Sequence, residues 1–150
     1  MNVTIYIDGG ARGNPGPAAA GIVIADSDGT PLRESGVYIG DATNNVAEYT
    51  GLVRALEAAI AMGATEVAAF SDSELVVKQM SGEYRVKNAG LIPLYEEATY
   101  FSKQFDAFSL THVRREKNVK ADALVNMSID CRKDIGDDLI PSDDEDEQQE

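Results

Sequence analysis

The spacing of apolar residues divides the start of the chain into three extended segments. Apolar and polar residues alternate over residues 3–7, which predicts a strand that ends at Asp8, where two glycines follow. Small apolar residues at 18–24 and the segment 32–39 predict two more strands, joined by the turn sequence Asp-Ser-Asp-Gly at 26–29. The chain is therefore expected to open with three antiparallel strands.

Helical spacing follows the third strand and then alternates with further strands. Residues 45–62 carry apolar or small side chains every three or four positions, and Gly63 is placed to end a helix. A short apolar strand at 66–70 runs into Asp72, so a second strand also ends at an acid. The remaining predicted elements are helices at 73–80, 91–104 and 118–132 and a last strand at 105–113. This order predicts an α/β fold with a mixed sheet.

Length and composition fit a single domain. With 150 residues, 43% of them hydrophobic, the chain can bury one core but is short for two. The N-terminus lacks a basic region followed by an apolar run, and no stretch approaches the roughly 20 apolar residues of a membrane span. We therefore expect a soluble, cytoplasmic monomer without membrane contact. The single cysteine, Cys131, has no His or Cys at ligand spacing and is expected to be inert.

Negative charge is concentrated at the C-terminus. The chain carries a net charge of −13, and eight acids with no base lie between Asp137 and Glu150, which leaves −5 for residues 1–136. We predict a folded domain at 1–132 and an acidic, disordered tail at 133–150. The tail could keep the protein soluble, inhibit in cis by mimicking nucleic acid, or attract a basic protein partner.

Four acids have ordinary structural explanations when each is considered alone. Asp8 precedes two glycines and could begin a turn, and Glu48 could complete a capping box with Asn45. Asp72 and Asp122 could each lie in the first turn of a helix, where the dipole favours an anion. None of the four is by itself a sign of catalysis.

Taken together, the same four acids indicate a metal site. In an α/β sheet, functional groups collect beyond the carboxyl ends of parallel strands, where Asp8 and Asp72 fall. Glu48 and Asp122 are both expected in first helical turns that can reach this edge. Because clustered carboxylates repel one another, the cluster requires cations, and oxygen ligands favour Mg²⁺ first and Mn²⁺ next. Two such ions would support in-line hydrolysis of a phosphodiester.

Four motifs in this order resemble type 1 ribonuclease H over about residues 1–130. They are DGGARGNPG at 8–16, TNNVAEY at 43–49, SDS at 71–73 and NVKAD at 118–122. The resemblance implies a five-stranded mixed sheet of order 3-2-1-4-5, with strand 2 antiparallel, flanked by helices. It also implies an endoribonuclease that cuts the RNA strand of an RNA–DNA hybrid and leaves 5′-phosphate and 3′-hydroxyl ends.

The resemblance further assigns a role to each acid. Asp8 would bridge two metal ions, Glu48 and Asp72 would complete the site of the leaving-group ion, and Asp122 would hold the ion that activates water. Positions that contact the DNA strand match Asn14, Thr43 and Asn45, and positions near the RNA backbone match Gly13, Asn44 and Glu74.

Glu74 departs from many relatives, which have Gln at this position. A carboxylate is less suited to a phosphate backbone, but it can still accept a hydrogen bond from a 2′-hydroxyl. Ser71 and Glu74 also have the spacing of a capping box, so a substrate contact and a cap remain open.

Two further departures concern turnover and substrate grip. Some relatives carry a His before the last aspartate, whereas the short loop here offers Arg115 or Glu116 as substitutes, and His112 is expected to be structural within the last strand. The basic protrusion of some members is absent from residues 81–90, which leaves Tyr84 as a possible stacking contact and predicts weaker affinity for the hybrid.

Two rival functions were weighed against the nuclease. A kinase-like phosphotransferase half would require a second lobe, and the Gly-Asn-Pro-Gly loop lacks the Gly-Lys-Ser/Thr ending of a P-loop. A catalytically weak hybrid- or partner-binding module, regulated by the acidic tail, is the remaining alternative. Intact carboxylates at all four ligand positions favour the enzyme.

Overall fold

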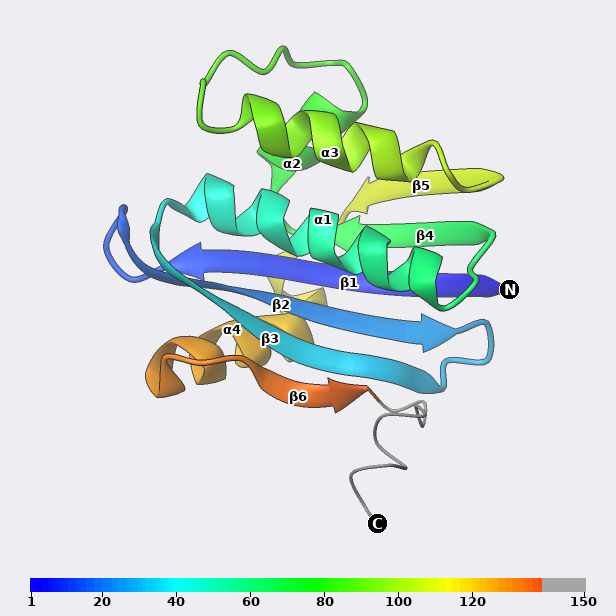
Figure 1. The fold of residues 1–150 in the computed structure, drawn as a ribbon, viewed down its shortest axis with the longest axis horizontal. Helices are drawn as coiled ribbons and strands as arrows, with labels where there is room; N and C mark the ends of the chain where they lie inside the picture. The colour runs from blue at the N-terminus through cyan, green and yellow to red at the C-terminus, as the bar shows by residue number, and fades with distance from the viewer. Residues whose placement is uncertain (139–150) are drawn as a thin grey trace.

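A computed structural model describes residues 1–138 as one mixed sheet covered by helices on both faces (Figure 1). The strands are β1 (Asn2–Ala11), β2 (Gly16–Asp26), β3 (Pro31–Ala42), β4 (Glu66–Ser71), β5 (Ala107–His112) and β6 (Ile135–Asp138). The helices are α1 (Asn44–Ala61), α2 (Glu74–Met80), α3 (Ile92–Ser102) and α4 (Val119–Cys131), with a single 3₁₀ turn at Arg115–Lys117. Helix α1 lies in front of β1 in this view and α4 lies behind β2 and β3.

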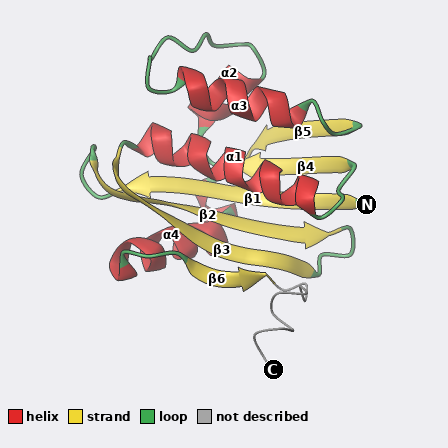
Figure 2. Cartoon of the chain, in the orientation of Figure 1, coloured by secondary structure: helices red, strands yellow, loops and turns green. Residues whose placement is uncertain are grey.

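The sheet has the order β5-β4-β1-β2-β3-β6. Strand β2 pairs antiparallel with both β1 and β3, whereas β1, β4 and β5 are parallel neighbours. The predicted order 3-2-1-4-5 and the antiparallel strand 2 are thus confirmed, with one further strand at the edge. Figure 2 shows the long strands crossing the molecule between α1 on the near face and α4 on the far face.

The core lies between the sheet and α1. Val3, Ile5 and Ile7 alternate along β1 and are buried against this helix, as the period of two in the sequence indicates. From α1, Leu52 and Leu56 are fully buried in the same cluster. The helix therefore owes its position to an apolar stripe at a spacing of three and four residues.

Strand β6 corrects the predicted start of the acidic tail. Residues Ile135–Asp138 pair antiparallel with β3, and Gly136 adopts a positive φ of 85° in that strand. The expected disorder from Lys133 onward is therefore wrong for these residues. Pairing with an exposed strand edge stabilises a segment that its composition alone would leave unfolded. The rest of the predicted tail, 139–150, lies outside the described residues.

Two helix caps differ from those predicted. Thr43 caps α1, where its hydroxyl accepts a hydrogen bond from the Val46 amide at 3.2 Å, so the capping box of Asn45 with Glu48 does not form. Glu48 lies two positions further along the helix than expected, just beyond the first turn. Ser73 caps α2 by accepting from the Val76 amide at 3.3 Å.

The only histidine also lies in an unexpected setting. His112 ends β5 and is exposed, so the structural role predicted for it inside the strand is wrong. Within residues 1–138, no helix is both long enough and apolar enough to cross a bilayer.

Candidate active site

Two parallel strands deliver two acids to one edge of the sheet. Ile7 of β1 is opposite Ser71 of β4 in the parallel register, so the next residues, Asp8 and Asp72, emerge side by side. Asp8 is buried and Asp72 is half-buried. The prediction that parallel strands would bring these two acids together agrees with this register.

Gly9 allows α1 to approach β1 closely enough to add Glu48. A Cβ atom at Gly9 would stand 2.4 Å from the carbonyl carbon of Ala47 and 2.4 Å from the amide nitrogen of Glu48. Only a residue without a side chain fits this contact. The buried Glu48 carboxylate therefore reaches Asp8 because the adjacent residue is glycine.

Gly21 has the matching role on the other face of the sheet. It lies opposite Asp8 in the β1–β2 ladder, and a Cβ there would stand 2.1 Å from the carbonyl oxygen of Ala121. Asn118, just before α4, donates from Nδ2 to the carbonyl oxygen of Ile7 at 2.7 Å. This close approach and this hydrogen bond place Asp122, in the first turn of α4, beside the end of β1.

The acids converge in a cleft of about 340 Å³. Carboxylate oxygens of Asp8, Glu48 and Asp72 lie within 4.8 Å of one another, the only such group of three potential ligands among the residues that the structure describes. Asp122 lines the same cleft and is close enough to Asp8 for its charge to act on that carboxyl group. Two neighbouring strands, β1 and β4, and one helix on each face of the sheet, α1 and α4, thus supply one group of oxygen donors.

Burial and mutual repulsion make these carboxylates hard to ionise without a cation. Burial, then the charges of Asp72 and Asp122, raises the pKa of Asp8 to about 7, although the Gly9 amide donates to its Oδ1 at 2.9 Å. Burial, then the charges of Asp8 and Asp72, holds the pKa of Glu48 well above its usual value. One oxygen of Glu48, Oε2, is buried without a hydrogen-bond partner. A bound cation would satisfy this oxygen and offset the repulsion.

The polar residues at the start of α1 connect the cleft to the loop after β1. Asn44 and Asn45 line the cleft. Asn44 accepts from the Ala11 amide at 2.8 Å through its side chain, and its own amide donates to Oδ1 of Asn14 at 3.0 Å. Asn14 and Thr43 therefore support the α1 start, but neither lines the cleft itself. Gly13 lies in the exposed loop with a positive φ of 79° and is also outside the cleft wall.

Glu74 is not part of the cleft wall. It is exposed and pairs with Lys78 one turn along α2, at 2.9 Å between Nζ and Oε1. The capping box predicted from Ser71 does not form, because Ser73 is the cap and Ser71 accepts from the Ser73 amide instead. A hydrogen bond from Lys78, then its charge, lowers the pKa of Glu74.

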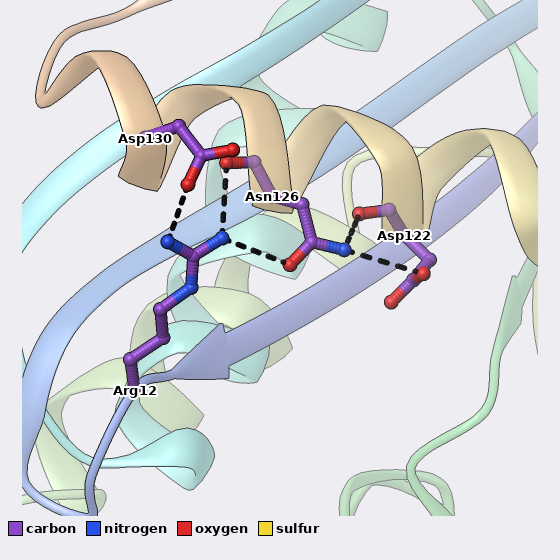
Figure 3. A network of polar contacts seen from close by, with 4 residues as sticks. All are labelled: Arg12, Asp122, Asn126 and Asp130. Carbon is purple, nitrogen blue, oxygen red and sulfur yellow. Dashed lines mark hydrogen bonds and ion pairs between the residues drawn. The ribbon is translucent and has the colours of Figure 1, made fainter.

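A polar network that the sequence did not reveal leads to Asp122 (Figure 3). Arg12, in the loop that directly follows β1, forms an ion pair with Asp130 and donates to the side-chain oxygen of Asn126 at 3.4 Å. Asn126 in turn donates to Oδ2 of Asp122 at 3.4 Å and to its carbonyl oxygen at 3.1 Å. Asn126 follows Asp122 by one helical turn, so the spacing alone could have identified it.

One of the two residues suggested to replace the missing loop histidine lies at the site. Arg115 lines the cleft, and its charge lowers the pKa of Glu48, the only favourable charge among the effects on that group. Glu116 is exposed in the same 3₁₀ turn but is not part of the cleft wall. The basic side chain of Arg115, rather than the acidic side chain of Glu116, therefore lies beside the carboxylates.

Comparison with known proteins gives one consistent set of matches. A family model described as reverse transcriptase-like matches residues 6–128. The crystal structure of RNase H1 from the halophilic archaeon Halobacterium salinarum has 44% identity and a TM-score of 0.84, and covers 87% of this chain and 99% of that chain. The structure of LC11-RNase H1 in complex with an RNA/DNA hybrid has 46% identity and a TM-score of 0.82, and covers 87% and 98%.

Among curated proteins, the bifunctional protein Rv2228c of Mycobacterium tuberculosis is 49% identical over 132 residues, which are 87% of this chain. The match spans 36% of the length of that protein. The shared region is therefore about a third of this larger relative.

Proposed function

The chain belongs to the ribonuclease H family, and from this premise we propose that it hydrolyses the RNA strand of RNA–DNA hybrids. The observation that carries the proposal is the convergence of Asp8, Glu48 and Asp72 within 4.8 Å in a cleft of a ribonuclease H fold. The reaction is endonucleolytic and leaves 5′-phosphate and 3′-hydroxyl ends. A relative that shares 46% identity was crystallised with an RNA/DNA hybrid, which supports the choice of substrate.

The donor set fits two divalent cations. All the converging side chains offer oxygen, which favours Mg²⁺ and then Mn²⁺ over softer metals, and the unpartnered Oε2 of Glu48 supplies an open ligand position. When bound, the ions supply an activated water and stabilise the oxygen that leaves phosphorus. Asp8 would bind both ions, Glu48 and Asp72 would complete one site, and Asp122 would complete the other.

The chain's own residues then orient the phosphodiester. Arg115 stands on the cleft wall with a charge that suits a phosphate oxygen. Asn44 and Asn45 line the same cleft with side-chain amide groups that can donate to the nucleic-acid backbone. Asn14 and Thr43 support the start of α1 through hydrogen bonds to the Asn44 and Val46 amides. By the family resemblance we assign Asn14, Thr43 and Asn45 to the side that contacts the DNA strand.

Distinction between RNA and DNA requires a contact with the 2′-hydroxyl, which only the RNA strand carries. We assign this contact to the RNA-backbone side, formed by Gly13 and Asn44. Glu74 pairs with Lys78 and does not line the cleft, so we assign it a peripheral contact at most.

A panel of labelled duplexes of one sequence tests the proposed substrate directly. We expect cleavage of the RNA strand of the hybrid in Mg²⁺ or Mn²⁺, and no cleavage of its DNA strand or of a DNA duplex. Product ends are identified by ligation, which requires the 5′-phosphate. Cleavage of the DNA strand, or equal cleavage of single-stranded RNA, would overturn the assignment.

A further inference from the structure

The face of α4 that borders the cleft carries three polar residues one turn apart. Asp122, Asn126 and Asp130 follow at intervals of four residues and therefore share one side of the helix (Figure 3). Arg12 reaches this side from the end of β1, more than a hundred positions away in the sequence. The helix and the loop after β1 are thus joined next to a proposed metal ligand.

We propose that Asn126 is a positioning residue for Asp122, and that Arg12 fixes the orientation in which its amide acts. The inference rests on the metal site of the proposed function. It concerns the orientation of the Asp122 carboxylate before a cation binds. Residues that hydrogen-bond to metal ligands, without contacting the metal, commonly set this orientation.

The chemistry of the three partners determines the orientation of the amide. A guanidinium group only donates hydrogen bonds, so the side-chain oxygen of Asn126 must face Arg12. The amide nitrogen then faces Asp122 and donates to it. The flipped amide would place N–H groups against the guanidinium and oxygen against a carboxylate, which are two repulsive contacts. Arg12 therefore selects the one orientation that supports Asp122.

Asp130 keeps the guanidinium in this position. Arg12 lines the cleft and could otherwise turn toward the buried carboxylates, where it would compete with a cation. The ion pair with Asp130 holds it at the outer end of the row, in contact with Asn126. The amide, and not the guanidinium, is thereby the group that contacts Asp122.

The consequence for the metal site follows from the hydrogen bonds to Asp122. The amide of Asn126 holds Oδ2 of Asp122 by a hydrogen bond at 3.4 Å, so the second carboxylate oxygen stays available as a metal ligand. Loss of this donor leaves the carboxylate free to rotate on the helix surface. The effect should therefore fall on metal affinity, with little change in the affinity for the hybrid.

The test measures metal binding and cleavage separately in Asn126→Ala and in Asn126→Leu, which keeps side-chain volume on the helix. Titration calorimetry of the metal-free proteins with Mn²⁺ reports binding without substrate. In both variants we expect Mn²⁺ affinity, and the Mg²⁺ affinity inferred from half-maximal cleavage, to fall by about tenfold. The cleavage rate should recover at high Mg²⁺ with an unchanged KM for the hybrid. Arg12→Ala should shift metal affinity in the same direction by a smaller factor.

Glu34→Gln provides a matched control. It removes an ion pair between Lys120 of α4 and β3, and it should leave both metal measurements unchanged. Wild-type affinity for Mn²⁺ in both Asn126 variants would overturn the proposal, as would a raised KM for the hybrid with metal binding intact. If the wild-type protein cuts no hybrid, the proposed function fails, while the calorimetric comparison still decides the role of Asn126.

Discussion

The acids in the cleft, Asp8 and Glu48, differ from the nearby acid Glu74 in burial, in charge environment and in the direction of their pKa shifts. Asp8 and Glu48 are buried, and repulsion and desolvation raise their pKa values. Glu74 is fully exposed, and its neighbour Lys78 lowers its pKa. Arg115 is the one favourable charge that acts on Glu48, and it does not offset burial and repulsion, whereas Glu74 already forms an ion pair with Lys78.

This difference separates functional acids from structural ones more clearly than sequence position does. An exposed ion pair one turn apart contributes little to stability and needs no further ligand. Buried carboxylates oppose folding unless a cation joins them, so their retention indicates a role that stability does not explain. Substitution of an acid in the cleft should therefore abolish metal binding and catalysis together.

The largest expected effect is the loss of hybrid cleavage in the variant Asp8→Asn. The substitution removes a charge from the centre of the cluster while it keeps the side-chain shape, so metal binding should be lost. We expect hybrid cleavage to fall by at least about a thousandfold, with an unchanged circular dichroism spectrum. Near-wild-type cleavage in this variant would show that the cluster is not the metal site.

The next effect concerns the approach of α1. Gly9→Ala would force a Cβ atom against the backbone of Ala47 and Glu48, so we expect a loss of about 1–3 kcal/mol in the free energy of unfolding. Gly10→Ala is the matched control, because its Cβ would meet only the Val125 side chain at 3.6 Å, an ordinary contact. Urea denaturation of both variants measures the difference. Equal losses would mean that the close approach at Gly9 is not required.

The raised pKa of Asp8 gives a smaller effect on the stability of the metal-free protein. Because the pKa of about 7 in the folded protein exceeds the ordinary aspartate value of 3.8, the stability linked to this group is complete below about pH 4 and is lost as the pH rises through 7. The Tm of Asp8→Asn should therefore exceed the wild-type Tm by about 3 °C at pH 8, and this difference in Tm should be smaller at pH 5. A gap that does not grow between pH 5 and 8, in melts with a chelator, would contradict this account.

The smallest effect is expected for Glu74→Gln. The substitution removes an exposed ion pair with Lys78 and restores the amide found in many relatives, so cleavage should change by less than about threefold. The rate at several salt concentrations measures it. A loss comparable to that of Asp8→Asn would place Glu74 among the residues that contact the reacting phosphate.

Local patterns in the sequence were sufficient for strands β1 to β5 and for two acids of the site. Alternation fixed β1, and the parallel register then places Asp8 beside Asp72. The roles of Gly9 and Gly21 could not be predicted, because each depends on the backbone of a helix that is remote in sequence. Helix positions suggested that Glu48 and Asp122 could reach the same edge, but only the family resemblance gave each of them a role at a particular metal ion.

Errors arose where one local signal concealed a tertiary contact. The acidic composition near Asp137 hid a strand that forms only because the edge of β3 is open to it. His112 follows a strand pattern that does not reveal which face is exposed at the sheet edge. The capping spacing of Glu48 suggested a local partner, whereas the helix actually begins at the cap Thr43.

The most direct test of the central claim is the cleavage rate of an RNA-labelled hybrid while divalent metal is removed and restored. The buried cluster of Asp8, Glu48 and Asp72 predicts that cleavage stops in excess chelator and returns when Mg²⁺ or Mn²⁺ is added back. Cleavage that continues at the same rate in excess chelator would contradict the account.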